Sequence, residues 1–248
     1  MIRAALLAWF GLSLVPLLPA ADAKVEKLTL GSGAAAHSYY LFIPDKPDAD
    51  PMPLVLLLHG SGRNGKSLMD PWLPLAKSEG IILVAPDASN PQAWRIPEEG
   101  PDFFHDLLET VRRQHDRVDG RRMYIFGHSA GAIHGLDLGV LESEYFAAVA
   151  VHAGVVSPEV MPLIEQAPRK TPMAIWVGTN DAFFPLSVVR QTRDTLNAHG
   201  FDVRLTEIRG HTHDYYGSAS TINKEVWAFF QQRKLAADPR FQQYQLVK

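Results

Sequence analysis

The feature that most constrains the fold is a series of short apolar segments that recurs along this 248-residue chain. Residues 54–58 are apolar throughout, as expected for a strand that is covered on both faces. The same character recurs at residues 81–85, 123–126, 147–151 and 173–177. Segments of helical length, with apolar residues every three or four positions, separate most of these strands at 103–117, 130–141, 187–199 and 221–234. This alternation predicts one α/β domain with a mostly parallel central sheet and helices on both faces.

Three further segments alternate apolar and polar residues and predict strands with one exposed face. Residues 25–30 and 37–43 are separated by Gly31-Ser32-Gly33, which predicts an antiparallel hairpin. Residues 203–208 also alternate, so we expect them near an edge of the sheet.

The N-terminal segment is typical of a secretory signal peptide. Residues 4–18 form an apolar stretch behind Arg3, and Ala21-Asp22-Ala23 offers small residues at a cleavage site. An N-terminal membrane anchor is the alternative, but the stretch is short and contains Pro16. We therefore expect residues 1–23 to be a signal peptide, residues 24–248 to form the domain, and the protein to be secreted or periplasmic. No later segment has 18 uncharged apolar residues, so no stable membrane insertion is expected after signal removal.

Charge and cysteine content exclude several classes of function. Lys and Arg together number 24 against 27 Asp and Glu, which leaves no basic excess to neutralise a nucleic-acid backbone. The chain has no cysteine, which excludes disulfides, thiolate metal sites and a cysteine nucleophile. A nucleophile in this protein must therefore be an oxygen, and the ten histidines are the main source of a general base.

The segment Gly127-His128-Ser129-Ala130-Gly131 predicts a catalytic nucleophile at Ser129. It follows an apolar strand and opens a helix, which is the context in which a G-x-S-x-G turn exposes its serine. Glycine flanks the serine because strand and helix crowd each other at such a turn. A serine that only caps the helix is the alternative interpretation.

A serine nucleophile needs an imidazole base, and the imidazole needs a carboxylate that fixes its tautomer. In a sheet of this kind the chain order is serine, acid, histidine. Asp181 follows a strand downstream of Ser129 and is the expected acid. His211 and His213 both follow the last predicted strand, and from position alone neither is favoured as the base. Four other carboxylates are less suited to be the acid because they lie in helices, at a strand start or ahead of the serine: Asp137, Asp194, Asp202 and Asp87.

Two backbone N–H groups are expected to stabilise the oxyanion of a tetrahedral intermediate. One belongs to Ala130, directly after the nucleophile, and the other to Ser61 in the glycine-rich loop after the first long strand. The pocket residues expected around this site are His59, His128, Trp94 and Phe183. The interval between residues 129 and 181 holds one more strand and no long helical insertion, so no large lid is expected.

Two other motifs indicate different chemistry. His211-Thr212-His213-Asp214 could ligate zinc, but no second cluster accompanies it, so neither a metal nor another cofactor is expected. Residues 60–67 match the phosphate-loop pattern G-x-x-x-x-G-K-S. A nucleotide-hydrolase interpretation would leave Ser129, Asp181 and His213 unexplained.

These residues resemble the α/β-hydrolase superfamily, and within it the exported polyhydroxybutyrate depolymerase and feruloyl esterase group. Residues 53–65 and 118–131 carry the likeness, together with Trp94 followed by Asp102-Phe103-Phe104. The C-terminal His-x-Tyr-Tyr segment is instead similar to S-formylglutathione-hydrolase-like esterases, in which the histidine before x-Tyr is the base. That resemblance implies His213 as the base, with His211 as the alternative.

We therefore expect a serine hydrolase that cleaves carboxylic esters through an acyl-enzyme, with Ser129, His213 and Asp181 as catalytic residues. Its partner would be a small-molecule or polymeric ester, and nucleic acid is not expected to bind. A serine peptidase of the same fold and a non-catalytic binding protein that retains the pocket are the alternatives.

Overall fold

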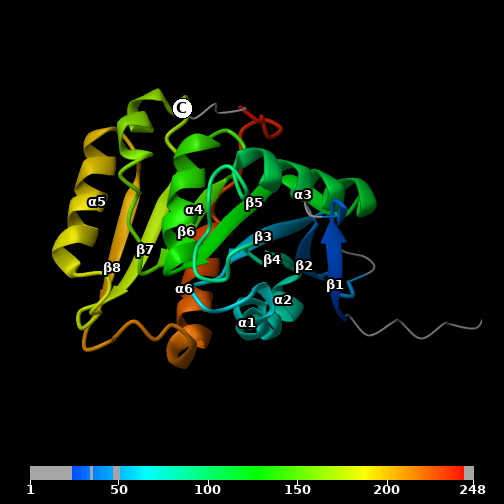
Figure 1. Ribbon diagram of the computed structural model, residues 1–248, viewed down its shortest axis with the longest axis horizontal. Coiled ribbons are helices and arrows are strands. Elements are labelled where there is room, and N and C mark those ends of the chain that lie inside the picture. The colour runs from blue at the N-terminus through cyan, green and yellow to red at the C-terminus, as the bar shows by residue number, and fades with distance from the viewer. Residues whose placement is uncertain (1–23, 34–35, 47–50, 243–248) are drawn as a thin grey trace, which may run out of the picture.

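The computed structural model describes residues 24–33, 36–46 and 51–242, and it forms one eight-stranded sheet in the order β1-β2-β4-β3-β5-β6-β7-β8 (Figure 1). The strands are β1 (Val25–Leu30), β2 (His37–Phe42), β3 (Met52–Leu58), β4 (Ile82–Pro86), β5 (Val118–His128), β6 (Ala148–His152), β7 (Met173–Gly178) and β8 (Val203–Ile208). The α-helices are α1 (Gly65–Met69), α2 (Leu73–Glu79), α3 (Pro101–Gln114), α4 (Ala130–Leu141), α5 (Leu186–Ala198) and α6 (Ala219–Phe230). Short 3-10 segments are η2 (Asp70–Trp72), η3 (Met161–Gln166) and η4 (Tyr216–Ser218).

The sheet topology confirms the predicted alternation. Strands β4, β3, β5, β6, β7 and β8 run parallel to one another. Strands β1 and β2 form the predicted antiparallel hairpin, and β2 pairs antiparallel with β4. Strand β8 lies at one edge of the sheet, as its alternating pattern predicts.

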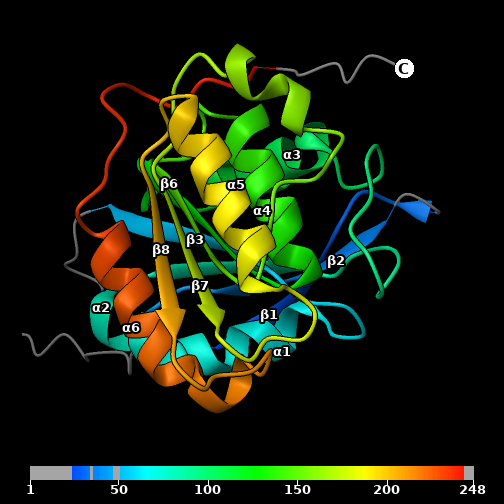
Figure 2. The ribbon, with the colours of Figure 1, turned by 90° about the vertical axis from the view of Figure 1, so that its left-hand side faces the viewer.

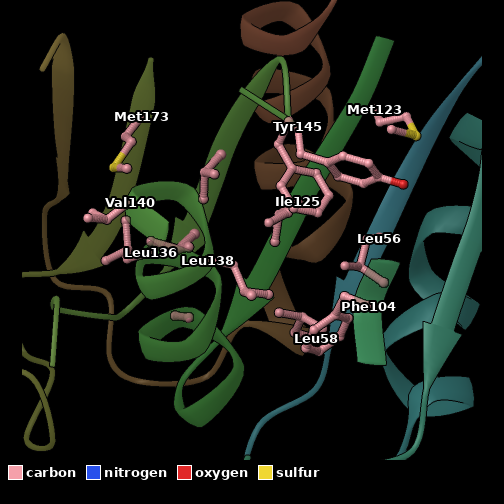
Figure 3. Close-up of a cluster of buried hydrophobic side chains, with 14 of the residues drawn as sticks. Leu56, Leu58, Phe104, Met123, Ile125, Leu136, Leu138, Val140, Tyr145 and Met173 are labelled. Atoms are coloured by element: carbon pink, nitrogen blue, oxygen red, sulfur yellow. The ribbon is translucent and has the colours of Figure 1, made fainter. Parts of the chain in front are cut away.

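Helices cover both faces of the sheet, as predicted. Helices α3, α4 and α5 lie on one face, and α1, α2 and α6 lie on the other (Figures 1 and 2). Within β3, Leu56 and Leu58 contribute to the core under the first group, while Val55 and Leu57 contribute to the core under the second. Figure 3 shows the first core, in which Phe104 packs near the leucines of β3. Burial on both faces is why these strands have continuous apolar sequences.

The helical segment between β3 and β4 was not predicted. Residues 65–79 form α1, η2 and α2, three short pieces that together make the crossover. Pro71 and Pro74 begin new pieces because proline lacks an N–H group and cannot continue a helix interior. Each piece is therefore too short for the apolar periodicity of a helix to be recognised in the sequence.

Other predicted boundaries shift by a few residues. Strand β5 is longer than the predicted 123–126, and α3 and α6 begin and end before their predicted limits. The predicted signal peptide, residues 1–23, lies outside the described residues. Among the residues that are described, no helix is long and apolar enough to cross a membrane.

The carboxyl ends of β3, β5, β7 and β8 meet at one edge of the sheet, where ligands of such sheets bind. In the described part of the chain the connection between β6 and β7 holds only η3, so no large lid covers this edge, as predicted. The loops that follow these strands carry the residues described next.

Candidate active site

Ser129 lies in the sharp turn between β5 and α4. Its backbone is strained, with φ 57° and ψ −118°, a region that residues with a side chain rarely occupy. A Cβ atom on Gly127 would lie 2.1 Å from the carbonyl oxygen of Gly131, and one on Gly131 would lie 2.0 Å from the carbonyl oxygen of Leu58. Only glycine fits at these two positions, so the sequence forces the strand and helix close together and lifts Ser129 above the sheet.

His213 lies between Ser129 and Asp181. The Ser129 Oγ is 2.9 Å from His213 Nε2, and His213 Nδ1 is 2.8 Å from Asp181 Oδ2. The three residues are far apart in the chain and come from the ends of β5, β7 and β8. A hydroxyl that donates to an imidazole, whose other nitrogen donates to a carboxylate, is the arrangement that activates serine as a nucleophile.

Backbone N–H groups hold Asp181 in its orientation. Its Oδ1 atom accepts hydrogen bonds from the N–H groups of Phe183 and Phe184, at 2.8 and 2.9 Å. The Asp181 side chain is fully buried, whereas that of His213 is 21% exposed. Oδ2 is therefore left for His213, and the carboxylate cannot rotate without breaking two hydrogen bonds.

His211, the alternative base, lies elsewhere. Its Nε2 atom is 3.1 Å from Nε2 of His152, at the end of β6. His152 in turn contacts His128, with the two Nδ1 atoms 3.1 Å apart. The structure thus brings His213, and not His211, into hydrogen-bond contact with Ser129 and Asp181.

The histidines behind the nucleophile are uncharged because they are buried. Burial, followed by the neighbouring imidazoles, lowers the pKa of His152 to about 2. Burial, followed by the nearby His213, lowers the pKa of His128 to about 4. Neither imidazole adds a positive charge to the site near neutral pH.

The two expected oxyanion donors border Ser129 on different loops. Ala130 is the first residue of α4, so its N–H has no partner within the helix, and it lies at the positive end of the helix dipole. Ser61 follows β3, and its Oγ donates to the carbonyl of Gln92 at 2.7 Å. The N–H groups of Gly62 and Arg63 are bonded to the carbonyls of other loop residues. These contacts fix the loop in which the Ser61 N–H lies.

A small cavity of about 260 Å³ contains the nucleophile. Ser129, His213 and Ser61 line it, together with His128. Its remaining lining residues are Gly60, Arg63, Asp214 and Tyr216. The cavity is large enough for one small portion of an ester beside the serine.

A second, larger cavity of about 900 Å³ is bordered by Ala130. Trp94 forms part of its wall, stacked on His134 of α4 with ring centroids 5.8 Å apart. His134 contacts the carbonyl of Glu99 at 2.7 Å, and Asp137 accepts the N–H of Ser157 at 2.9 Å. Through these contacts one face of α4 holds two loops, one with Trp94 and Glu99 and the other with Ser157. Both loops contribute to the wall of the cavity. Burial raises the pKa of Asp137 to about 7.

The four predicted pocket residues have different environments. Trp94 lines the large cavity and His128 the small one. Phe183 is 74% exposed at the rim, with its ring 4.8 Å from that of His213. His59 is buried against Trp94, accepts the N–H of Ala88 on Nε2, and is not among the residues that line either cavity.

Sequence reasoning did not find the cavity walls formed by α4. In the sequence Asp137 is only a rival candidate for the acid, and His134 is only one of the ten histidines. His134 lies four residues after Ala130, and Asp137 lies four residues after Ile133 and three after His134, so the helical spacing places them on one face of α4. That spacing was the signal available.

The other two motifs overlap this site, since His213 belongs to the His211–Asp214 motif and Ser61 to the phosphate-loop pattern. No group of three histidine or carboxylate side chains in the described residues could hold a metal ion. Lys66 of the phosphate-loop pattern forms an ion pair with Asp70, 2.7 Å away in the following turn.

Comparisons with known proteins agree with this fold. The family model for esterase PHB depolymerases matches residues 37–175. An S-formylglutathione hydrolase from Agrobacterium tumefaciens superposes with a TM-score of 0.69 at 19% identity, over 86% of this chain and 96% of that one. The fluorophosphonate-binding serine hydrolase FphF of Staphylococcus aureus gives 0.70 at 13%, over 85% and 99%. An acylaminoacyl peptidase from Pyrococcus horikoshii gives 0.67 at 15%, over 90% of this chain but 44% of its own. These similarities establish the α/β-hydrolase fold.

Proposed function

The chain belongs to the esterase PHB depolymerase family of serine ester hydrolases, and we propose that Ser129, His213 and Asp181 form its catalytic triad. The observation that carries this proposal is the position of the His213 ring, with one nitrogen 2.9 Å from Ser129 Oγ and the other 2.8 Å from Asp181 Oδ2. Because a carboxylate can only accept, His213 carries its proton on Nδ1 and leaves Nε2 free to accept the serine proton.

The first half of the reaction acylates the serine. Ser129 Oγ attacks the ester carbonyl carbon while its proton moves to His213 Nε2. The imidazolium formed is stabilised by Asp181, whose charge lies against Nδ1–H. When the tetrahedral intermediate collapses, the bond to the alcohol oxygen breaks and Nε2 returns the proton to that oxygen. The alcohol leaves, and the acyl group remains on Ser129.

The second half repeats these steps with water. His213 Nε2 takes a proton from water as its oxygen attacks the acyl-enzyme, then gives the proton to Ser129 Oγ as the acid departs. In both halves negative charge develops on the former carbonyl oxygen. We assign the N–H groups of Ala130 and Ser61 as its donors, supported by the position of Ala130 at the start of α4 and of Ser61 beside Ser129 in the small cavity.

The two cavities support a division of the substrate between them. The small cavity accommodates the smaller portion of the ester, and the large, open cavity with Trp94 on its wall accommodates a bulky acyl or alcohol group. A small-molecule ester or the end of a polymeric ester fits this division.

The test is replacement of the nucleophile. Ser129→Ala should lower kcat for a 4-nitrophenyl ester by at least about 10³-fold, because it removes the oxygen that His213 Nε2 contacts. Ser187→Ala, an exposed serine on α5, is the matched control and should retain activity. Undiminished turnover by Ser129→Ala would refute the proposal.

Two further measurements separate the alternatives. A fluorophosphonate should label the wild-type protein at Ser129 and leave Ser129→Ala unlabelled, whereas a binding protein without a working triad would stay unlabelled in both forms. Parallel assays with peptide amides and with esters test the peptidase alternative. A higher kcat/KM for the amides would replace the esterase assignment.

We also propose that the protein is exported, with cleavage after Ala23. The apolar stretch behind Arg3 and the small residues before Lys24 support this. An exported serine hydrolase without cysteine would depend on core packing alone for its stability.

A further inference from the structure

Three histidines that the proposed mechanism does not use form a chain of imidazoles behind the nucleophile. Nδ1 of His128 lies 3.1 Å from Nδ1 of His152, and Nε2 of His152 lies 3.1 Å from Nε2 of His211. His128 and His152 end the neighbouring strands β5 and β6, and His211 follows β8. The side chain of His152 is fully buried, so each of its ring nitrogens has another imidazole as its partner.

The protons on this chain are coupled. A neutral imidazole has one N–H and one lone pair, and each N···N contact holds one proton. If His128 donates from Nδ1, then His152 must donate from Nε2 to His211. If His211 donates instead, His152 donates from Nδ1, and His128 carries its proton on Nε2. The tautomers of all three residues therefore change together.

A backbone carbonyl selects one of these arrangements when all three rings are neutral. His128 Nδ1 is also 3.4 Å from the carbonyl oxygen of His152, which can only accept. A proton on His128 Nδ1 satisfies both contacts, whereas a lone pair there would face the carbonyl oxygen. His128 Nε2 is then a bare acceptor.

Protonation of His211, the partly buried residue at one end of this chain of imidazoles, reverses the direction in which the three residues donate their hydrogen bonds. A charged His211 carries protons on both nitrogens and must donate from Nε2, which moves the proton of His128 to its Nε2. His128 and His152 do not take up the charge, because burial lowers the pKa of His128 to about 4 and burial with the neighbouring imidazoles lowers that of His152 to about 2. The titratable groups that face His128 and His152 from the surrounding elements are His213, Tyr215, Tyr216, Asp181 and Asp214.

The His128 ring borders the small cavity. Cδ2, which is bonded to Nε2, lies 3.2 Å from where a Cβ on Gly60 would be. Gly60 and His128 both line the cavity that contains Ser129. Because Nδ1 contacts His152, Nε2 is the ring nitrogen left for a substrate in this cavity.

We propose that His128 is a specificity-determining residue whose Nε2 hydrogen-bonds the portion of the ester in the small cavity, and that His152 and His211 are positioning residues that set whether Nε2 accepts or donates. The inference rests on the proposed function of Ser129. With His211 neutral, Nε2 accepts, so the favoured substrate carries a hydroxyl or an amide N–H. With His211 charged, Nε2 donates, and an ether or carbonyl oxygen is equally acceptable.

The experiment compares hydroxy and methoxy esters, because a hydroxyl both donates and accepts whereas a methoxy oxygen only accepts. One pair differs in the alcohol, 2-hydroxyethyl against 2-methoxyethyl butanoate. The other pair differs in the acyl group: ethyl 3-hydroxypropanoate against ethyl 3-methoxypropanoate. The ratio of kcat/KM within a pair cancels the protonation of His213, which both substrates share. Histidine changes charge between about pH 5 and 8, so the assay spans that range.

In the wild type we expect one pair to give a hydroxy-to-methoxy ratio of about threefold to tenfold at pH 8, the value of one hydrogen bond. The ratio should fall toward one at pH 5. His128→Phe should give a ratio near one at every pH, and His211→Phe should remove the pH dependence. His199→Gln, beyond the far end of α5, is the matched control and should behave as wild type.

Several outcomes would overturn the inference. A wild type that hydrolyses both members of each pair equally at pH 8 shows that Nε2 makes no such bond. A His128→Phe variant that keeps the wild-type ratio also shows that Nε2 makes no such bond. If His128→Phe does not fold, His211→Phe decides, because a ratio that still changes with pH excludes His211. Absence of any ester hydrolysis would instead contradict the proposed function of Ser129.

Discussion

Replacement of Asp181 by asparagine tests whether the carboxylate acts by fixing the tautomer of His213. Asparagine has nearly the same shape, but one of its two terminal atoms is an NH2 group that donates only. The N–H groups of Phe183 and Phe184, 2.8 and 2.9 Å from Oδ1, require the amide oxygen at that position. The NH2 group of Asp181→Asn must therefore face Nδ1 of His213.

This orientation forces His213 into the wrong tautomer. Nδ1 becomes an acceptor, the proton moves to Nε2, and Nε2 can no longer take the proton of Ser129. Reaching the reactive tautomer loses one charge-assisted hydrogen bond, about 1.5–3 kcal/mol, and leaves two donors facing each other, about 1–3 kcal/mol more. The sum is about 2.5–6 kcal/mol, or about 10² to 10⁴-fold in kcat.

The assay is steady-state hydrolysis of a 4-nitrophenyl ester, with thermal unfolding measured in parallel. Asp194→Asn, an exposed carboxylate on α5 away from both cavities, is the matched control and should retain the activity. A kcat for Asp181→Asn within tenfold of wild type, in a folded protein, would refute the assigned role of the carboxylate.

Three further predictions concern the fold and the N-terminus. Gly131→Ala should lower the free energy of unfolding, measured with urea, by about 3 kcal/mol or more, because its Cβ would overlap the carbonyl of Leu58. Gly210→Ala is the control: it has open space around it and only its positive φ as a cost, so the free energy of unfolding should fall by about 1 kcal/mol. Asp137 has its pKa raised to about 7 by burial, so its contribution to stability is complete below about pH 4 and is lost as the pH rises through 7. Asp137→Asn should remove that part of the pH dependence in thermal melts, and an unchanged profile would contradict it. Export of the full chain should yield a mature protein that begins at Lys24, as N-terminal sequencing can determine; an intact N-terminus would contradict cleavage.

The strand–turn–helix at Ser129 could be predicted because its cause is local. Gly127 and Gly131 are needed where β5 and α4 crowd each other, and both residues lie within two positions of the serine. The chain order of Ser129 and Asp181 could also be predicted, because parallel strands present their carboxyl ends at one edge of the sheet.

The choice between His211 and His213 could not be made from their spacing. The two residues follow the same strand, and on a loop a separation of two decides nothing about direction. In the structure the carbonyl of His211 accepts the N–H of Asn180, which holds that residue beside the end of β7. The chain then turns, and His213 extends to Asp181 and Ser129. The resemblance to S-formylglutathione-hydrolase-like esterases favoured the same residue.

The crossover at residues 65–79 was missed for a different reason. Pro71 and Pro74 divide it into three pieces, each too short for an apolar period to be recognised. Packing against the sheet, in which Trp72 is fully buried, supplies the stabilisation that the local sequence lacks.

The sequence by itself determined the α/β architecture, the two faces of the sheet and the exposed serine, because apolar periodicity and glycine crowding act within a few residues. Only the tertiary structure decided which histidine meets Ser129 and how the other imidazoles are connected. His128 and His152 are adjacent because the parallel register of β5 and β6 aligns them, 24 positions apart in the chain. Register and loop direction depend on the packing of the whole sheet, so side-chain contacts of this kind cannot be obtained from local patterns.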